Sequence, residues 1–298
     1  MKRILCCVVY ALCGIPLFAQ SHVEVLAKPD NTVDFCLAGV DAPGTRTVLL
    51  NLTGLTNCDH PAGEYPFVVS NDGVFLTLRP HDSRIEIGYD YTYRVLDVWL
   101  NAPADRAFVY RLPCSAARPA AVAVREKQGV AGPSKDFSAC CFACEKGDTV
   151  YAVRRGVVTQ VRYGEREPGA GAGGDSALRN SSLYVEHADG SVARYGMPEG
   201  ANLLVKAGEV VFPDTPLASA GDGSTSFSVS LFRVVLNSGK NAGLYFVLFE
   251  YFRPLFATDR GNTRLLSGES YRPVVTRELV GREMTAKEAK RYERGKRR

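Results

Sequence analysis

The chain has 298 residues, of which 46% are hydrophobic and 23% are charged, a balance typical of a globular protein that buries substantial cores. The net charge of +4 is small, and residues 276–298 alone hold nine Lys or Arg against four Glu, so the rest of the chain is close to neutral. This balance excludes the extended basic surface of a nucleic-acid-binding protein, and we expect no nucleic acid among the partners.

The N-terminus has the pattern of an export signal. Lys2 and Arg3 precede an apolar run over residues 4–17, and Ala19 offers a small residue for cleavage. The run is short for a membrane span, and no later segment of the sequence is long and apolar enough to form one. We therefore predict a signal peptide at 1–19 and export to the periplasm or the extracellular space. An uncleaved N-terminal anchor is the alternative.

Residues 23–125 contain a series of short strand patterns. Four segments are rich in β-branched and aromatic residues, namely 47–52, 65–69, 74–78 and 108–112. The turn sequence Asn-Asp-Gly at 71–73 predicts a hairpin, because Asn and Gly tolerate a positive φ. Tyr89, Tyr91 and Tyr93 alternate with other residues, so we expect them to share one face and to pack in a core. The spacing predicts a β-sandwich domain over 23–125.

Two glycine-rich stretches organise the middle of the chain. Glycine and proline near residue 130 predict a linker at 126–136, followed by a second β-rich block at 137–275. Within that block, residues 167–175 are rich in glycine. A phosphate-binding loop would need a Lys-Ser/Thr pair and a helix directly after the glycines, and the sequence has neither. The pattern is typical of a flexible hairpin insertion instead.

The C-terminal segment 276–298 is predicted to be a basic helical tail. Thr285 can cap a helix, and Glu288, three residues later, completes a capping box. We predict that this tail is a solvated terminus. The alternative is attraction to anionic lipid or wall polymer, and any membrane contact is expected to run through this tail.

Cysteines beyond the signal peptide are even in number, which predicts disulfides in an exported protein. They are Cys36, Cys58, Cys114, Cys140, Cys141 and Cys144. The last two form a C-x-x-C motif, with a third thiol directly before it. The prediction is a structural disulfide from this segment to Cys114 or to the sandwich. A redox dithiol and a three-thiolate metal site are the alternatives.

A recognisable order of strands and glycine turns runs through residues 144–232. Its pieces are 145–153, 155–158, 183–190, 193–197, 205–211, 217–221 and 224–232. Together they resemble the lysostaphin-type (M23) zinc endopeptidases, which cut peptide bridges in bacterial peptidoglycan. The resemblance covers roughly residues 135–235, under half of the chain. It implies an antiparallel β-sheet domain of the duplicated hybrid motif type, so the expected fold is all-β: a β-sandwich, an M23-like domain and a short C-terminal helix.

The zinc ligands that the resemblance implies are missing from the sequence. The family's H-x-x-x-D pair, Y-x-H histidine and H-x-H strand fall on Phe137, Cys141, Met197, Ser228 and Ser230. Zinc hydrolysis needs about three N, O or S ligands and an open position for water. His187 corresponds to a hairpin residue in the family and not to a ligand. We therefore expect neither catalytic residues nor a bound zinc.

A groove that has lost its metal can still recognise the shape of a ligand. The resemblance implies that its floor is formed by Phe137, Tyr195, Met197, Ser228 and Ser230. The predicted function is a catalytically inactive cell-envelope protein that binds peptidoglycan or controls a cell-wall hydrolase. Two alternatives stay open, an active zinc endopeptidase with a non-standard site and a purely structural envelope protein.

Overall fold

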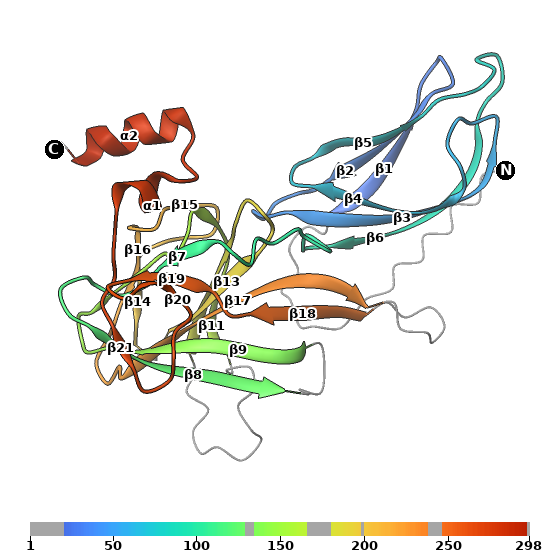
Figure 1. Cartoon of the computed structure of the whole chain (residues 1–298). Coiled ribbons are helices and arrows are strands. Elements are labelled where there is room, and N and C mark those ends of the chain that lie inside the picture. Colours follow the sequence, from blue (N-terminus) through green and yellow to red (C-terminus); the bar gives the residue numbers. More distant parts are fainter. Residues whose placement is uncertain (1–20, 129–133, 166–179, 198–199, 238–245, 297–298) are drawn as a thin grey trace. The chain divides into compact units, whose positions relative to one another are not determined.

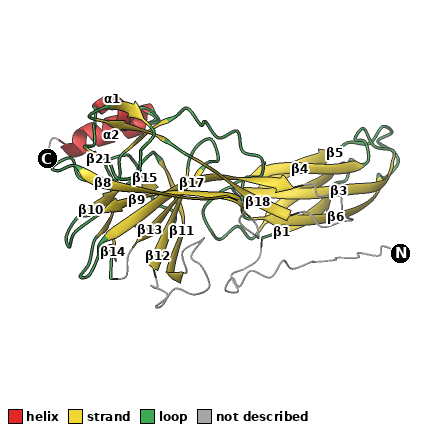
Figure 2. Cartoon of the chain, turned by 60° about the horizontal axis from the view of Figure 1, so that its bottom comes forward, coloured by secondary structure: helices red, strands yellow, loops and turns green. Residues whose placement is uncertain are grey.

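The computed structural model describes residues 21–128, 134–165, 180–197, 200–237 and 246–296. These residues are almost entirely strands and loops, and two helices follow the last strand (Figure 2). The predicted all-β class is confirmed. None of the helices among the described residues is long and apolar enough to cross a membrane. The predicted signal peptide at 1–19 and the glycine-rich insertion at 167–175 lie outside the described residues.

The chain forms two compact units, Met1–Leu100 and Asn101–Arg298. The first is a β-sandwich of two three-stranded antiparallel sheets, as far as its described residues show (Figure 1). One sheet contains β1 (His22–Ala27), β2 (Val33–Ala38) and β5 (Gly73–Leu78). The other contains β4 (Gly63–Val69), β3 (Arg46–Thr56) and β6 (Gly88–Leu96). Both sheets contribute to one core, in which Phe35, Leu50 and Leu78 are fully buried.

The tyrosines of β6 share the inner face of the sandwich, as their alternation predicts. The rings of Tyr89 and Tyr91 meet the Phe35 ring of the opposite sheet edge-on, with centroids 5.9 and 5.3 Å apart. The hairpin predicted at 71–73 is wrong, because β4 pairs with β3 whereas β5 pairs with β2. The Asp72 carboxylate accepts a hydrogen bond from the Val40 amide at 2.8 Å, and the chain crosses there from one sheet to the other.

A nine-stranded sheet dominates the described part of the second unit, in the order β15-β11-β12-β13-β17-β18-β9-β8-β21. Its strands are β8 (Ala120–Gln128), β9 (Ser134–Ala143), β11 (Gly156–Glu165), β12 (Asn180–Glu186), β13 (Val192–Met197), β15 (Val210–Val211), β17 (Ser226–Asn237), β18 (Phe246–Phe252) and β21 (Ser270–Tyr271). Strand β17 also pairs with β9. Every pairing is antiparallel except that of β18 with β9.

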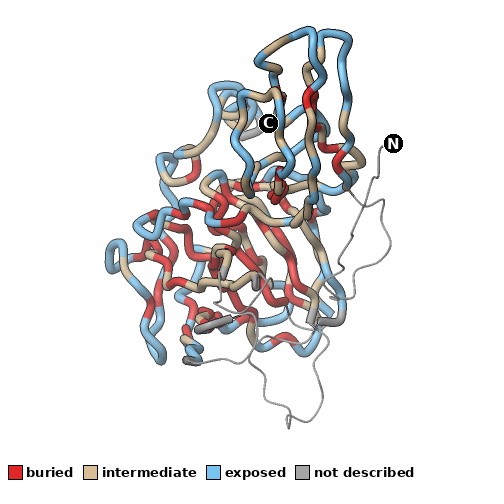
Figure 3. Tube along the Cα trace, turned by 90° about the vertical axis from the view of Figure 1, so that its right-hand side faces the viewer, coloured by how far each residue is buried: buried red, intermediate tan, exposed pale blue. Residues whose placement is uncertain are grey.

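Two small sheets complete this unit within the described residues. They are built from β10 (Thr149–Tyr151), β16 (Pro216–Ser219) and β14 (Asn202–Leu203), and from β20 (Gly261–Thr263), β19 (Leu255–Thr258) and β7 (Val109–Arg111). They pack with one face of the large sheet around a core that includes Tyr195, Phe142, Leu217 and Phe256. Figure 3 shows the buried residues gathered along the strands and the exposed residues in the loops between them.

The division between the units lies earlier in the chain than predicted. The strand pattern of residues 108–112 predicts that they belong to the sandwich, but β7 pairs in parallel with β19 of the second unit. The predicted linker at 126–136 overlaps a pair of antiparallel strands, since β8 and β9 pair from Val122 and Phe142 to Gln128 and Asp136. The glycines and the proline lie between these two paired strands. Composition alone does not distinguish a connection between paired strands from a linker between domains.

Two helices form the C-terminal tail, α1 (Arg277–Gly281) and α2 (Ala286–Lys296). The predicted capping box is confirmed, because the Glu288 amide donates to Thr285 Oγ1 at 3.3 Å and the Thr285 amide donates to Glu288 Oε2 at 2.7 Å. The short α1, capped by Thr276, was not predicted. The tail is not simply a solvated terminus, because Val280 is buried and Glu288 forms an ion pair with Arg155.

Candidate functional site

Two of the predicted groove positions, Ser228 and Ser230, lie together on one face of the large sheet. Ser228 and Ser230 alternate along β17 and so point to the same side. Opposite Ser228 on β9 lies Cys141, and opposite Ser230 on β13 lies Arg194. Because directly paired residues share a face, these four side chains form one row, which we call the polar row. It lies on the side of the sheet away from the core, and all four side chains are buried.

Phe137 continues this face beyond the polar row. It lies four residues before Cys141 on β9 and therefore on the same side. Its ring contacts the ring of Tyr251 on β18, with centroids 5.1 Å apart, and Tyr251 contacts Phe232 at 5.3 Å. Phe232 also meets Phe249 edge-on at 5.3 Å. These four rings form the aromatic cluster, and it adjoins the polar row because Phe232 follows Ser230 by two residues on β17.

Tyr195 and Met197 do not belong to this face, which corrects the predicted groove. Both are fully buried in the core, and the Tyr195 hydroxyl accepts a hydrogen bond from the Val153 amide at 2.8 Å. Counting along the family motif assigns positions but does not say which side of a strand they occupy. The strand alternation of β13 instead places Arg194 and Gly196 at the positions that face the side of the polar row.

Arg194 is the residue of this face that the sequence did not reveal. Its guanidinium donates to Ser182 Oγ at 2.7 Å and to the Tyr184 hydroxyl at 3.2 Å, both on β12. An arginine keeps its positive charge at any pH at which a protein is folded. Because Arg194 lies in the same buried row as Ser230, its positive charge disfavours the binding of a metal cation in that row.

The polar row does not fit the zinc ion that the family resemblance implies. It offers one thiol and two hydroxyls, and serine hydroxyls are not among the usual zinc ligands. Within the described ranges, no group of three or more His, Cys, Asp or Glu side chains is arranged to hold a metal. Ser230 Oγ is buried and has no hydrogen-bond partner, which marks it as a polar group with unused capacity.

None of these six cysteines is joined by a disulfide in the described structure, and the disulfides predicted from their number stay a prediction. Cys140 and Cys141 are neighbours on β9 and point to opposite faces of the sheet. Cys140 and Cys144 face the core, whereas Cys141 faces the polar row, so the segment cannot gather three thiolates around one metal. Burial raises the pKa of Cys140 to about 12, which disfavours the reactive thiolate of a redox dithiol.

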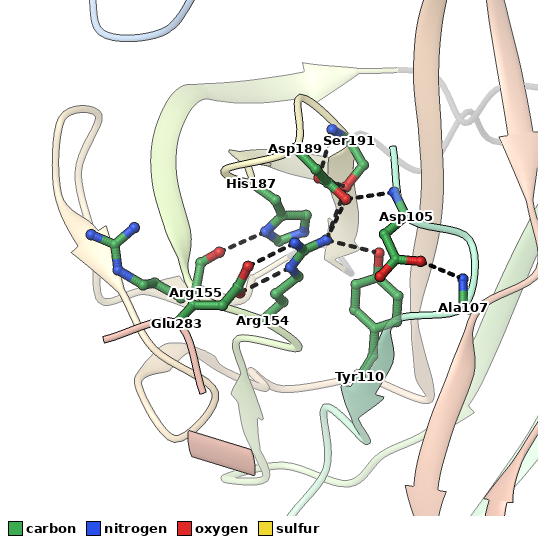
Figure 4. Close-up of polar contacts among 9 residues, drawn as sticks. All are labelled: Asp105, Ala107, Tyr110, Arg154, Arg155, His187, Asp189, Ser191 and Glu283. Atoms are coloured by element: carbon green, nitrogen blue, oxygen red, sulfur yellow. Dashed lines mark hydrogen bonds and ion pairs between the residues drawn. The ribbon is translucent and has the colours of Figure 1, made fainter. Parts of the chain in front are cut away.

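A second polar cluster surrounds Arg154, which lies in the loop between β10 and β11 (Figure 4). Its guanidinium is 4% exposed and bonds two carboxylates, Asp189 at 2.8 Å and Glu283 at 2.7 and 2.9 Å. It also lies 3.7 Å from the centre of the Phe108 ring. Burial alone would lower the pKa of Arg154, but the bonds to Glu283 and Asp189 raise it above its ordinary value.

Asp189 holds two further segments in place. One oxygen accepts hydrogen bonds from the Ser191 amide and hydroxyl at 3.1 and 2.7 Å, and the other accepts the Asp105 amide at 2.7 Å. Burial works to raise the pKa of Asp189, but the hydrogen bonds from Arg154 and Ser191 lower it to about 2. Asp189 is therefore ionised over the range in which the protein is expected to be folded.

His187 is enclosed beside the same guanidinium. Its Nδ1 lies 2.9 Å from the Arg155 carbonyl oxygen, and because a carbonyl only accepts, Nδ1 carries the proton. Nε2 is buried and has no hydrogen-bond partner. Complete burial, followed by the charge of Arg154, lowers the pKa of His187 well below its ordinary value. His187 is thus a neutral core residue, as expected for a hairpin position and not for a ligand.

We call Arg154, Asp189, Glu283 and His187 the Arg154 clamp. Both carboxylates are committed to one guanidinium and the histidine is enclosed, so the cluster offers no group for acid–base chemistry. Its geometry ties the C-terminal tail, through Glu283, to the hairpin between β12 and β13 and to residue 105. Sequence reasoning missed it, because no local pattern connects Arg154 to a glutamate 129 residues later.

Comparison with known proteins adds little to these observations. No protein-family model matches the chain, and no curated protein matches it by sequence. Among solved structures, the chain is similar to Csd3 of Helicobacter pylori, with 10% sequence identity and a TM-score of 0.28 over 94% of this chain and 84% of that chain. A similarity with so low a TM-score indicates neither a fold nor a function for this chain.

Proposed function

We propose that the protein is a catalytically inactive, M23-like module of the cell envelope that binds peptidoglycan through its stem peptides. One observation carries the proposal: Phe137, Cys141, Ser228 and Ser230, which stand at the family's ligand positions, gather on one face without supplying a zinc site. What the family uses for chemistry is here a buried set of hydroxyls, one thiol and an aromatic ring. The resemblance to the M23 family supplies the class of ligand.

The composition of this face suits a peptide better than a charged glycan. Hydroxyl groups such as Ser230 Oγ can bond the amides of a peptide backbone, and aromatic rings such as Phe137 pack against short apolar side chains. Ser230 Oγ has its bonding capacity unused, so a bound amide would satisfy a buried polar atom that has no partner in the chain. The alternative partner is a cell-wall hydrolase, and the sedimentation experiment described next also bears on that alternative.

The double variant Ser230→Ala, Phe137→Leu is expected to weaken binding to purified insoluble peptidoglycan about 10-fold. It removes one hydroxyl and one ring face while keeping most of the buried volume, and together these contribute roughly 1.4 kcal/mol. The measurement is the fraction of protein that sediments with peptidoglycan as its concentration is varied. The matched control is Ser219→Ala, Phe75→Leu, which makes the same chemical changes on β16 and β5 and should leave sedimentation unchanged.

Two outcomes would contradict the proposal. A wild-type chain that stays in the supernatant at all peptidoglycan concentrations does not bind the wall, and a protein partner such as a hydrolase would then have to be sought. Equal loss of sedimentation in both double variants would mean that binding does not use the face of the polar row.

A further inference from the structure

Helix α2 has two faces of different character. Its inner face contacts the body of the second unit through Glu288, which pairs with Arg155 at 2.7 Å, and through Tyr292, which hydrogen-bonds Asp214. Ala289 lies between them on the same side and is partly buried. Figure 1 shows α2 at the periphery of this unit, connected to it through α1. Its other side faces solvent.

Three of the four glutamates of the tail form ion pairs with arginines. Glu283 pairs with Arg154, Glu288 with Arg155 and Glu293 with Arg277. The first two pairs join the tail to the loop between β10 and β11, and the third joins α2 to α1. Three of the four carboxylates that balance the tail's charge in the sequence are therefore engaged with arginines outside the outer side of α2.

Four basic residues remain on the outer side of α2, namely Lys287, Lys290, Arg291 and Arg294. Their spacing of three, four and seven residues places them on one helix face, and all four are exposed. Among the described residues, no ion pair or hydrogen bond involves any of these four side chains. We call them the basic row, and at 1.5 Å per residue it extends about 10 Å along the helix.

We propose that the basic row docks the protein on a membrane surface through the phosphodiester headgroups of anionic phospholipids. A convex helix with its cations in one row can bring all of them close to a planar layer of negative charge at once. The outer face presents no large apolar side chain, so the contact is electrostatic and α2 rests on the headgroups without entering the acyl region. This inference does not depend on the proposed peptidoglycan binding.

The effect of single charges sets the size of the expected signal. Each Lys or Arg near an anionic bilayer changes the association constant about fivefold at physiological ionic strength. The double variant Lys290→Gln, Arg291→Gln is therefore expected to lower the association constant roughly 25-fold. Neither side chain belongs to the Arg154 clamp or to the inner face, so the fold of α2 should persist.

The test is co-sedimentation of the full chain with large vesicles of two compositions, phosphatidylcholine alone and phosphatidylcholine with a minority of phosphatidylglycerol. Binding to the neutral vesicles measures any association through the apolar segment 4–17. The additional binding to the anionic vesicles measures the association through the basic row. The matched control is Arg125→Gln, Arg264→Gln, which removes the same charge at exposed positions on β8 and beside β20. Far-ultraviolet circular dichroism checks that each variant retains the wild-type fold.

The proposal expects wild-type and control chains to bind anionic vesicles, with binding that falls as salt is added, and the α2 variant to lose that excess. It is overturned if wild-type chain binds both vesicles equally, or if control and α2 variants lose the same amount. It is also overturned if soluble polyphosphate binds the basic row while anionic vesicles do not, because the occupant would then be a dissolved polyanion.

Discussion

Replacing Arg154 with methionine is expected to lower the free energy of unfolding by about 3–5 kcal/mol. The guanidinium bonds Asp189 and Glu283 in a buried site, and its loss leaves two partly buried carboxylates facing each other without a cation. Removing one partner of a buried ion pair costs the desolvation of the group that remains. Urea unfolding followed by circular dichroism measures the change. The single tryptophan, Trp99, lies in the first unit and would not report on the clamp.

The control for this variant is Arg106→Met. Arg106 also pairs with a carboxylate, Glu250, but its side chain is 50% exposed. Exposed ion pairs contribute less than about 1 kcal/mol, so this variant should unfold close to the wild type. If Arg154→Met is no less stable than Arg106→Met, the clamp does not hold the C-terminal tail in the way that its contacts indicate.

Mild acid is expected to destabilise the second unit through His187. Burial and Arg154 lower the pKa of His187 in the folded chain, whereas the unfolded chain has the ordinary value of about 6.5. As the pH falls below that value, the unfolded chain binds a proton that the folded chain does not. The contribution of His187 to the free energy of unfolding is therefore fully present above about pH 6.5. Below that pH it declines by up to about 1.4 kcal/mol per pH unit. Asp189, with a folded pKa of about 2, adds its own loss only below about pH 4.

The variant His187→Asn isolates this contribution. The asparagine amide can still donate to the Arg155 carbonyl but does not titrate. Between about pH 7 and about pH 5, the wild type should lose about 2 kcal/mol more unfolding free energy than the variant. Urea titrations at the two pH values measure the difference. Parallel losses in the two proteins would mean that His187 is protonated in the folded state or that the acid sensitivity arises elsewhere.

Features that depend on neighbouring residues could be predicted from the sequence. The capping box of Thr285 and Glu288 needs only a spacing of three residues, and the shared face of Tyr89, Tyr91 and Tyr93 needs only strand alternation. Both are present in the structure. The turn at 71–73 shows the limit of this reasoning, because a turn sequence fixes a local reversal of the chain but not the strand with which each arm pairs.

The candidate site was predicted only in part for the same reason. The row of Cys141 and Ser228 depends on the pairing of β9 with β17, and Arg194 joins it only because β13 pairs on the other side. Counting along the family motif predicts Tyr195 in the groove, whereas the register of β13 places it in the core. Glu283 looked like one charge of a solvated tail, since its partner Arg154 is far away in the sequence.

The zinc content of the purified full chain, expressed without added metal and measured by elemental analysis, tests the central claim most directly. We expect no stoichiometric zinc, because the polar row offers Cys141, two serine hydroxyls and a fixed cation instead of histidine and carboxylate ligands. One zinc per chain would contradict the proposal of an inactive module. It would mean that the chain builds a non-standard metal site, and the alternative of an active peptidoglycan endopeptidase would then replace it.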